Sequence, residues 1–197
     1  MTHTSHSWPR LRRALIGLGL LAGLVGSPLA LAAEEAPPFV VNAVYPRNVD
    51  GVIRIDADVR YSLNPVLRDA LHNGVDLVIE MELRVQRLRD WWVNEDVAEL
   101  VQRYRLGYYT LSRLYVVQNL NTGVQTTYPS LGSALYALGA LRDFPLIDTS
   151  LLLPGEHYRG GLRARLDIDQ LPLPLRVRAY ASEDWRPASE WYEWSLP

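Results

Sequence analysis

The chain contains no cysteine and no lysine among its 197 residues. Without cysteine it can form no disulfide bond, has no thiolate nucleophile and offers no sulfur ligand to a metal. Its 20 basic residues are all arginine. This composition fits either recognition of carboxylates and phosphates or a coding bias against lysine. Because disulfide bonds are excluded, the fold must be stabilised by packing, without covalent crosslinks.

An excess of positive charge is also missing. The 20 basic and 22 acidic residues give the whole chain a formal charge of −2. Three of the arginines lie within the first 33 residues, so the remainder has 17 arginines against 22 carboxylates, a formal charge of −5. Proteins that bind nucleic acid usually carry a basic patch or a net positive charge. We therefore expect no nucleic-acid partner.

Histidine is scarce, and no nucleophile motif is present. Beyond residue 33 the only histidines are His72 and His157, and neither lies in an HExxH or His-x-His spacing. The sequence thus predicts no metal site and no cofactor. Ser133 follows a glycine but lacks the second glycine of a nucleophile elbow. We expect no catalytic residues and a protein that is not an enzyme.

The first 33 residues have the pattern of an export signal. Arginines at positions 10, 12 and 13 precede an apolar run, and the small residues Ala30 and Ala32 have the spacing that signal peptidase requires. The pattern predicts cleavage before Ala33, or alternatively before Glu34. We expect the mature protein to be periplasmic or secreted.

A membrane anchor is the alternative interpretation of the same segment. Residues 14–33 contain no charged side chain, and about 20 apolar residues suffice to span a bilayer. Pro28 opposes this interpretation because it would interrupt the last turns of a spanning helix. If the segment stays in place, the protein is anchored in the inner membrane.

Alternation with a period of two dominates residues 34–197. From Val52 to Tyr61, apolar residues alternate with charged ones, as in a strand with one buried and one solvent face. The same pattern runs through residues 75–86 and 162–169. Further strands are predicted at Phe39–Tyr45, Leu100–Tyr109, Leu114–Leu120, Val124–Tyr128, Leu173–Ala181 and Trp191–Leu196.

Two short helices interrupt these strands. Asn64 is a suitable N-cap for a helix that begins at Pro65 and ends at Gly74. Ser130 precedes an apolar stripe at helical spacing that extends from Leu131 to Leu141.

Many short strands with two short helices predict a mainly β fold. The pattern is typical of an antiparallel β-sandwich, immunoglobulin-like or related, formed as a single domain by residues 34–197. Pro172 and Pro174 place the predicted 173–181 strand at a sheet edge, because proline cannot donate to a central ladder.

Two carboxylate pairs are the strongest candidates for a cation site or an acid–base pair. On a strand, Asp56 and Asp58 share one face, and so do Asp167 and Asp169. Arginines lie on the same faces. We therefore favour cross-strand charge pairing between residues 54–60 and 163–169.

Aromatic residues supply the predicted binding site. Adjacent residues Trp91 and Trp92 cannot both face the core of one strand, so one of them should be exposed or packed under a loop. An exposed tryptophan beside arginines is typical of an interface hot spot. With Tyr108, Trp185 and Trp191, these are the predicted binding residues. Aromatic plugs at the ends of the sandwich are the structural alternative.

Several segments carry a family resemblance. They are the export signal, Trp91-Trp92, LSRLY from Leu111, LDIDQLPLPLRVRAY from Leu166 and SEWYEWSL from Ser189. Together they resemble an uncharacterised proteobacterial family of exported proteins, known as a domain of unknown function or a proline-rich signal peptide protein. The resemblance implies no catalytic or binding residue. It implies an association with a signalling system, since members are often encoded beside an envelope sensor histidine kinase of the nitrogen-regulation type.

Three functions are compatible with these patterns. We expect a non-catalytic exported binding or accessory protein, whose partner is a membrane or periplasmic protein such as the outer domain of a sensor. The first alternative is a small-ligand-binding protein with a cavity between its sheets. The second is a hydrolase that uses carboxylates alone. Contact with the membrane is expected only transiently, through the signal peptide.

Overall fold

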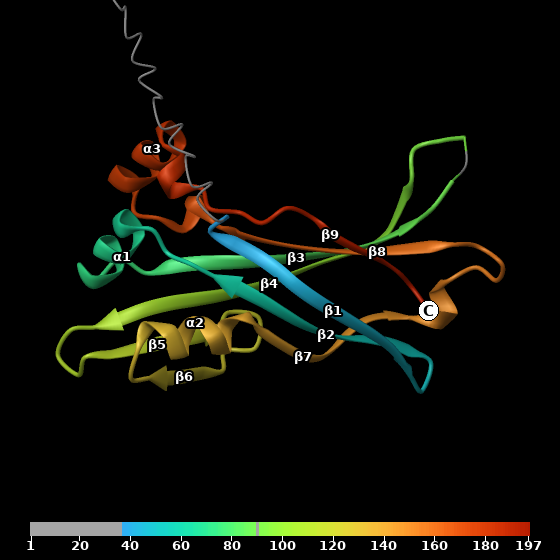
Figure 1. Ribbon diagram of the computed structural model, residues 1–197, viewed down its shortest axis with the longest axis horizontal. Coiled ribbons are helices and arrows are strands. Elements are labelled where there is room, and N and C mark those ends of the chain that lie inside the picture. Colours follow the sequence, from blue (N-terminus) through green and yellow to red (C-terminus); the bar gives the residue numbers. More distant parts are fainter. Residues whose placement is uncertain (1–36, 90) are drawn as a thin grey trace, which may run out of the picture. The chain divides into compact units, whose positions relative to one another are not determined.

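A computed structural model describes residues 37–89 and 91–197, and the predicted export signal lies outside these residues. The described chain forms two antiparallel sheets (Figure 1). The smaller sheet has the order β1 (Phe39–Val49), β2 (Val52–Tyr61) and β7 (Ala140–Asp148). The larger has the order β6 (Gln125–Tyr128), β5 (Leu114–Asn119), β4 (Glu95–Tyr109), β3 (Leu77–Arg87), β8 (Tyr158–Leu166) and β9 (Tyr192–Ser195).

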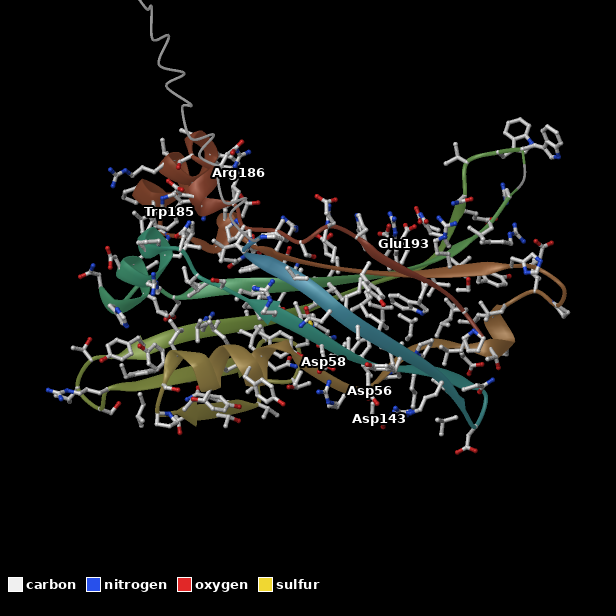
Figure 2. The ribbon with its side chains drawn as sticks, viewed as in Figure 1. Asp56, Asp58, Asp143, Trp185, Arg186 and Glu193 are labelled. Atoms are coloured by element: carbon white, nitrogen blue, oxygen red, sulfur yellow. The ribbon has the colours of Figure 1, made fainter. Side chains whose placement is uncertain are left out.

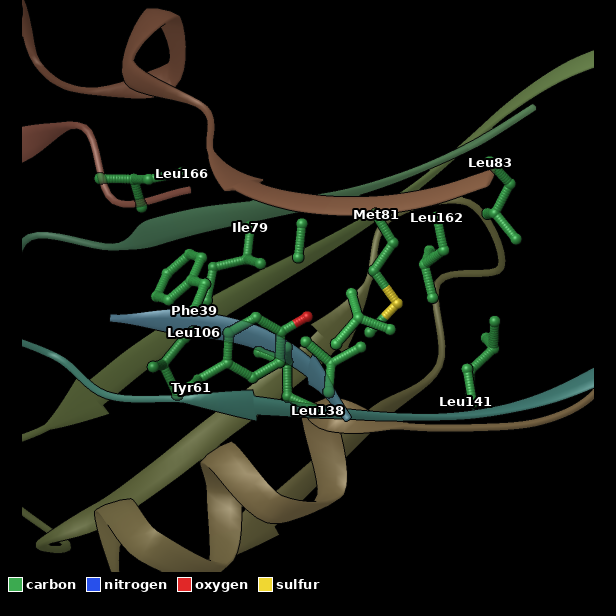
Figure 3. Packing of buried hydrophobic residues seen from close by; sticks show 14 of the residues in the cluster. Phe39, Tyr61, Ile79, Met81, Leu83, Leu106, Leu138, Leu141, Leu162 and Leu166 are labelled. Atoms are coloured by element: carbon green, nitrogen blue, oxygen red, sulfur yellow. The ribbon is translucent and has the colours of Figure 1, made fainter. Parts of the chain in front are cut away.

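The two sheets share one apolar core. Alternate residues of β2 are buried, which is the consequence of the period-two pattern in the sequence, whereas β3 buries its first five residues and alternates from Met81 onward. Figure 3 shows Met81 and Leu162 of the larger sheet on the same core as Tyr61 and Leu141 of the smaller one. The predicted mainly β antiparallel sandwich is confirmed.

The two predicted helices are present. In α1 (Pro65–His72) the Asn64 side chain accepts a hydrogen bond from the Leu67 amide at 2.9 Å, and Gly74 has φ +82° just beyond the helix. Both features match the predicted cap and stop. In α2 (Leu131–Gly139) the Ser130 and Ser133 side chains form a capping box. Ser133 therefore has a structural role at a helix start.

One predicted strand is wrong. Residues Leu173–Ala181 form a third helix, α3, that follows β8. Its two prolines lie at the N-cap and in the first turn, Pro172 and Pro174. At these positions the missing amide hydrogen costs no intrahelical bond, so proline begins a helix as readily as it ends a strand pairing. No helix of the described residues is long and apolar enough to cross a membrane.

One strand was missed. The helix predicted to extend to Leu141 ends at Gly139, and β7 follows it directly. β7 is an edge strand that contains Pro145, and its pairing with β2 shifts register twice. Asp143, with φ +48°, lies within the second shift, between Leu141 and Phe144. These irregularities remove the regular alternation by which the other strands were recognised.

Candidate functional site

The connection between β3 and β4 carries three consecutive exposed apolar side chains. Trp91 is 92% exposed, Trp92 80% and Val93 88%. We call these three residues the aromatic tip. Figure 1 shows the β3–β4 connection projecting away from the larger sheet. The sequence predicted that one of the two tryptophans would be exposed or packed under a loop, and the structure exposes both.

Charged residues lie at the base of this connection. Arg87 of β3 and Glu95 of β4 are the last residue pair of the β3–β4 ladder. Both Arg87 and Arg89 donate hydrogen bonds to the Glu95 carboxylate. The Arg87 hydrogen bond is the main cause that lowers the pKa of Glu95 below its ordinary value. The two arms of the connection are thus joined beneath the aromatic tip.

The other three predicted site residues lie elsewhere. Trp185 is buried in the core at 7% exposure, so it is not available on the surface. Trp191 lies against the guanidinium groups of Arg84 and Arg163, with ring centroid distances of 4.0 and 4.7 Å. These are cation–π contacts within the protein. The five predicted residues therefore do not form one site.

Tyr108 belongs to a separate aromatic cluster at the end of α1. Its ring centroid is 4.9 Å from that of His72 and 4.8 Å from that of Tyr115. His72 Nε2 and the Tyr115 hydroxyl are hydrogen-bonded at 2.7 Å. The cluster joins α1 to the larger sheet, and His72 is exposed as the sequence suggested.

The outer face of the larger sheet carries carboxylates beneath arginines. The Glu80 side chain is 2% exposed and lies 2.6 Å from Arg103 Nε and 2.5 Å from an Arg165 amino group. These arginine side chains are 46% and 41% exposed. The surface that solvent meets is therefore made of guanidinium groups.

Glu82 continues this network along β3. Its carboxylate accepts hydrogen bonds from Arg163 and Arg165 on the neighbouring strand β8. Burial raises the pKa of Glu82, but the hydrogen bonds and charges of the two arginines outweigh burial, and the net pKa is lowered. The arginines of β8 are thus engaged by carboxylates of β3.

The Asp56 and Asp58 carboxylates are also engaged in ion pairs. Asp56 accepts from Arg47 and from the Asp143 amide at 2.7 Å, while Asp58 accepts from Arg142 at 2.6 Å. The hydrogen bond from Arg47 is the main cause that lowers the pKa of Asp56. Figure 2 shows Asp56, Asp58 and Asp143 close together on the smaller sheet.

The predicted partners of these charges were wrong. β2 and β8 belong to different sheets, so residues 54–60 cannot pair with residues 163–169. Asp167 and Asp169 do not share a strand face either, because Asp167 caps a 3-10 turn that contains Asp169, and it accepts from the Asp169 amide at 3.1 Å. Across residues 37–89 and 91–197, no three metal-ligating side chains come together.

An open groove lies between α2 and the β1–β2 hairpin. Its volume is about 670 Å³, and its lining includes Tyr45 and Arg60 from the hairpin and Tyr136 from α2. Pockets for small ligands usually fall in the range of about 300–1,000 Å³. The groove combines aromatic rings with the Asp58–Arg142 ion pair. It is the feature that a small-ligand function would use.

A family described as "Domain of unknown function (DUF4390)" matches residues 36–195. The match covers nearly all of the region that forms the two sheets. No curated protein and no solved structure matches the chain.

Proposed function

We propose that this chain, which belongs to the DUF4390 family, is a non-catalytic exported binding or accessory protein. In this proposal the aromatic tip is the surface that binds a protein partner. The observation that carries the proposal is the exposure of Trp91, Trp92 and Val93, each at 80% or more.

The energetics of the aromatic tip favour a binding role. Burying apolar surface is favourable by about 25 cal/mol for each Å² removed from water. The exposed side chains of the tip gain this free energy only when a partner pocket covers them. Tryptophan is enriched among the few residues that dominate protein interfaces. The Glu95 pairs with Arg87 and Arg89 hold the base of the connection before any partner binds. Less ordering entropy is then lost on binding.

The cellular setting of the proposal comes from the sequence. The basic start and uncharged run before residue 34 support export to the periplasm or beyond. The resemblance to a proteobacterial family of exported proteins supports a partner of the signalling class. We therefore propose the outer domain of a membrane sensor as the binding partner.

Site-specific photocrosslinking in the source cells tests this proposal. A photoreactive side chain at Asn94, beside the aromatic tip, should crosslink to one envelope protein. The double substitution Trp91→Ala and Trp92→Ala should reduce that crosslink about tenfold, as expected for hot-spot residues. The matched control is Leu111→Ala, since Leu111 is 102% exposed in the turn between β4 and β5. An unchanged crosslink in the double variant would show that the tip is not the binding site.

The groove beside α2 supports one alternative function. Its size and its aromatic lining suit a small ligand that stacks on Tyr136, which is 78% exposed. Native mass spectrometry of protein purified from its own cell envelope should then show a retained mass. Tyr136→Ala should lose that mass, whereas a bare polypeptide in the unaltered protein would contradict this alternative.

A further inference from the structure

Helix α3 turns apolar side chains toward solvent. Leu173 is 71% exposed, Val177 72% and Tyr180 59%. The spacing i, i+4, i+7 places the three side chains in one row along the helix. The opposite side of α3 faces the protein through Ala179, which is fully buried, and Leu175, which is half-buried. We call the exposed row the α3 stripe.

Arginines lie on both flanks of the α3 stripe. With 3.6 residues per turn, Arg176 lies about 60° around the helix from the row, and Arg178 lies farther around on the other side, towards Leu175. Arg178 is exposed, and Arg176 donates a hydrogen bond to the Leu171 carbonyl at 3.1 Å. Arg186 follows the helix, and Figure 2 shows it beside α3. An apolar row between two arginines matches the layering of a bilayer surface, where acyl chains lie beneath phosphates.

Acidic residues occupy other positions around α3. Asp169 accepts a hydrogen bond from the Tyr180 hydroxyl at 2.5 Å. Glu183 and Asp184 come after the C-terminal end of the helix, in a 3-10 turn. These carboxylates balance the arginines in number. Attraction to the bilayer therefore depends mainly on the apolar row and on the two flanking guanidinium groups.

The described chain begins close to α3. Pro38 lines the same groove as Arg186 and Pro187, which come shortly after the helix. In the sequence, the uncharged run of residues 14–33 ends only four residues before residue 37. Four residues span at most about 14 Å. The described chain therefore starts at the end of the domain that carries α3, and the sequence before it contains an uncharged run of membrane-spanning length.

We propose that α3 is an interfacial helix that rests on the headgroup region of a phospholipid bilayer. The α3 stripe enters the boundary between headgroups and acyl chains, while Arg178 and Arg176 contact lipid phosphates. Only three apolar side chains are buried, so this attachment is weak and reversible. The surface is distinct from the aromatic tip and adds membrane docking to the proposed partner binding.

The absence of cysteine permits a direct test. Val177→Cys carries the sole thiol of the chain and accepts an environment-sensitive NBD fluorophore. The labelled protein is purified in the form that its host exports. It is then mixed with vesicles of phosphatidylethanolamine and phosphatidylglycerol. We expect a blue shift and an intensity increase of about twofold or more when the label enters the interface. The same label at Val124, which is 64% exposed in the β5–β6 turn, should show no such change.

Substitutions in the α3 stripe give a second measurement. Leu173→Ser with Val177→Ser should weaken cosedimentation with the same vesicles about tenfold, because the buried apolar area is lost. Val124→Ser with Leu151→Ser removes apolar side chains of similar exposure elsewhere and should have no effect. Circular dichroism checks that all variants remain folded.

Three results would overturn the proposal. They are equal NBD responses at positions 177 and 124, unchanged vesicle binding of the α3 stripe variant, and loss of vesicle binding through Trp91→Ala with Trp92→Ala instead. The last result would assign the bilayer contact to the aromatic tip. If Trp91→Ala with Trp92→Ala lost the protein crosslink but kept normal vesicle binding, the result would support partner binding by the aromatic tip and would leave the bilayer contact at α3.

Discussion

Of two pairs of tryptophans in this chain, one packs against a neighbouring strand and the other is exposed to solvent. Trp191 immediately precedes β9 and packs against Gly161 of β8. Trp194 lies within β9 and packs against Gly160 of the same strand β8. Trp91 and Trp92 stand at least 80% exposed in the connection between β3 and β4. The difference lies in the neighbouring strand, because glycines without side chains leave a flat surface on which an indole ring can rest.

The comparison shows what makes an aromatic residue structural. The Trp194 ring lies directly over Gly160, where an added Cβ would be only 2.3 Å from a ring atom. Trp191 is held on the other side by arginines that are themselves held by carboxylates. At the aromatic tip, the ion pairs of Glu95 with Arg87 and Arg89 lie at the base of the connection. Aromatic content alone therefore does not distinguish a tryptophan that packs on the protein from one that solvent reaches.

The largest effect is expected where the glycine surface is filled. Gly160→Ala should destabilise the protein by about 2 kcal/mol, because the Trp194 ring must move to admit the methyl group. Urea denaturation measures the change. Gly132→Ala is the control, since no atom lies within 4 Å of the added methyl group in α2, and it should be neutral or slightly stabilising. Equal stability of both variants would contradict the packing argument.

Removing the Trp191 ring, which packs against the same strand β8, should have a smaller effect. Trp191→Ala loses the contacts with Arg84 and Arg163, and we expect a decrease of about 1–1.5 kcal/mol in the free energy of unfolding. The decrease should be smaller at high salt if the cation–π contacts contribute. Chemical denaturation at two ionic strengths provides this measurement. An unchanged stability would show that Trp191 is held passively.

The carboxylate beneath Arg163 should make stability depend on pH. The pKa of Glu82 is lowered in the folded protein from an ordinary value of 4.5. Its stabilising contribution is therefore complete above that value and is lost as the pH falls through the lower folded pKa. Glu82→Gln should flatten this part of the stability curve, measured by Tm between neutral and acidic pH. Parallel curves for both proteins would refute the assignment.

The smallest change in stability is expected at the aromatic tip. Trp91→Ala with Trp92→Ala should alter the free energy of unfolding by less than about 0.5 kcal/mol, because both side chains are exposed. The same variant should lose the tryptophan emission that acrylamide quenches most readily. Fluorescence quenching and thermal unfolding together check the prediction. A marked loss of stability would mean that the tip packs against the protein.

The sequence predicted elements that are determined locally. β2 has the predicted bounds, because its alternation of apolar and charged residues is complete. The start of α1 was predicted from Asn64 and Pro65, whose effects on the first turn need no distant contact. In each case the residues concerned are neighbours along the chain.

Predictions failed where distant contacts or unusual exposure decided the outcome. The apolar residues of α3 alternate with Pro174, Arg176 and Arg178, which imitates an edge strand, and three of its large apolar side chains face solvent instead of the core. Charge pairing was predicted correctly in kind but with the wrong partners. Strand order places β3 next to β8, and residue spacing carries no information on that order.

The candidate site was only partly predictable. The adjacent tryptophans indicated an exposed aromatic residue, and Val93 could have been added as the next apolar residue in the chain. The burial of Trp185 and the enclosure of Trp191 depend on neighbours that are distant in sequence. Residue type therefore suggested the site, whereas topology selected which aromatic residues are free to bind.

The long strand β4 gives the aromatic tip a mechanical property. β4 runs from Glu95, at the base of the connection, to Tyr109, and it pairs with β3 along most of this length. β3 is bonded in turn to β8 from Arg87 to Ile79. The interstrand hydrogen bonds are perpendicular to the strands. A partner that pulls on the tip along the strand axis pulls β3 and β4 together, so the hydrogen bonds between β3 and β8 are loaded in shear and oppose the displacement.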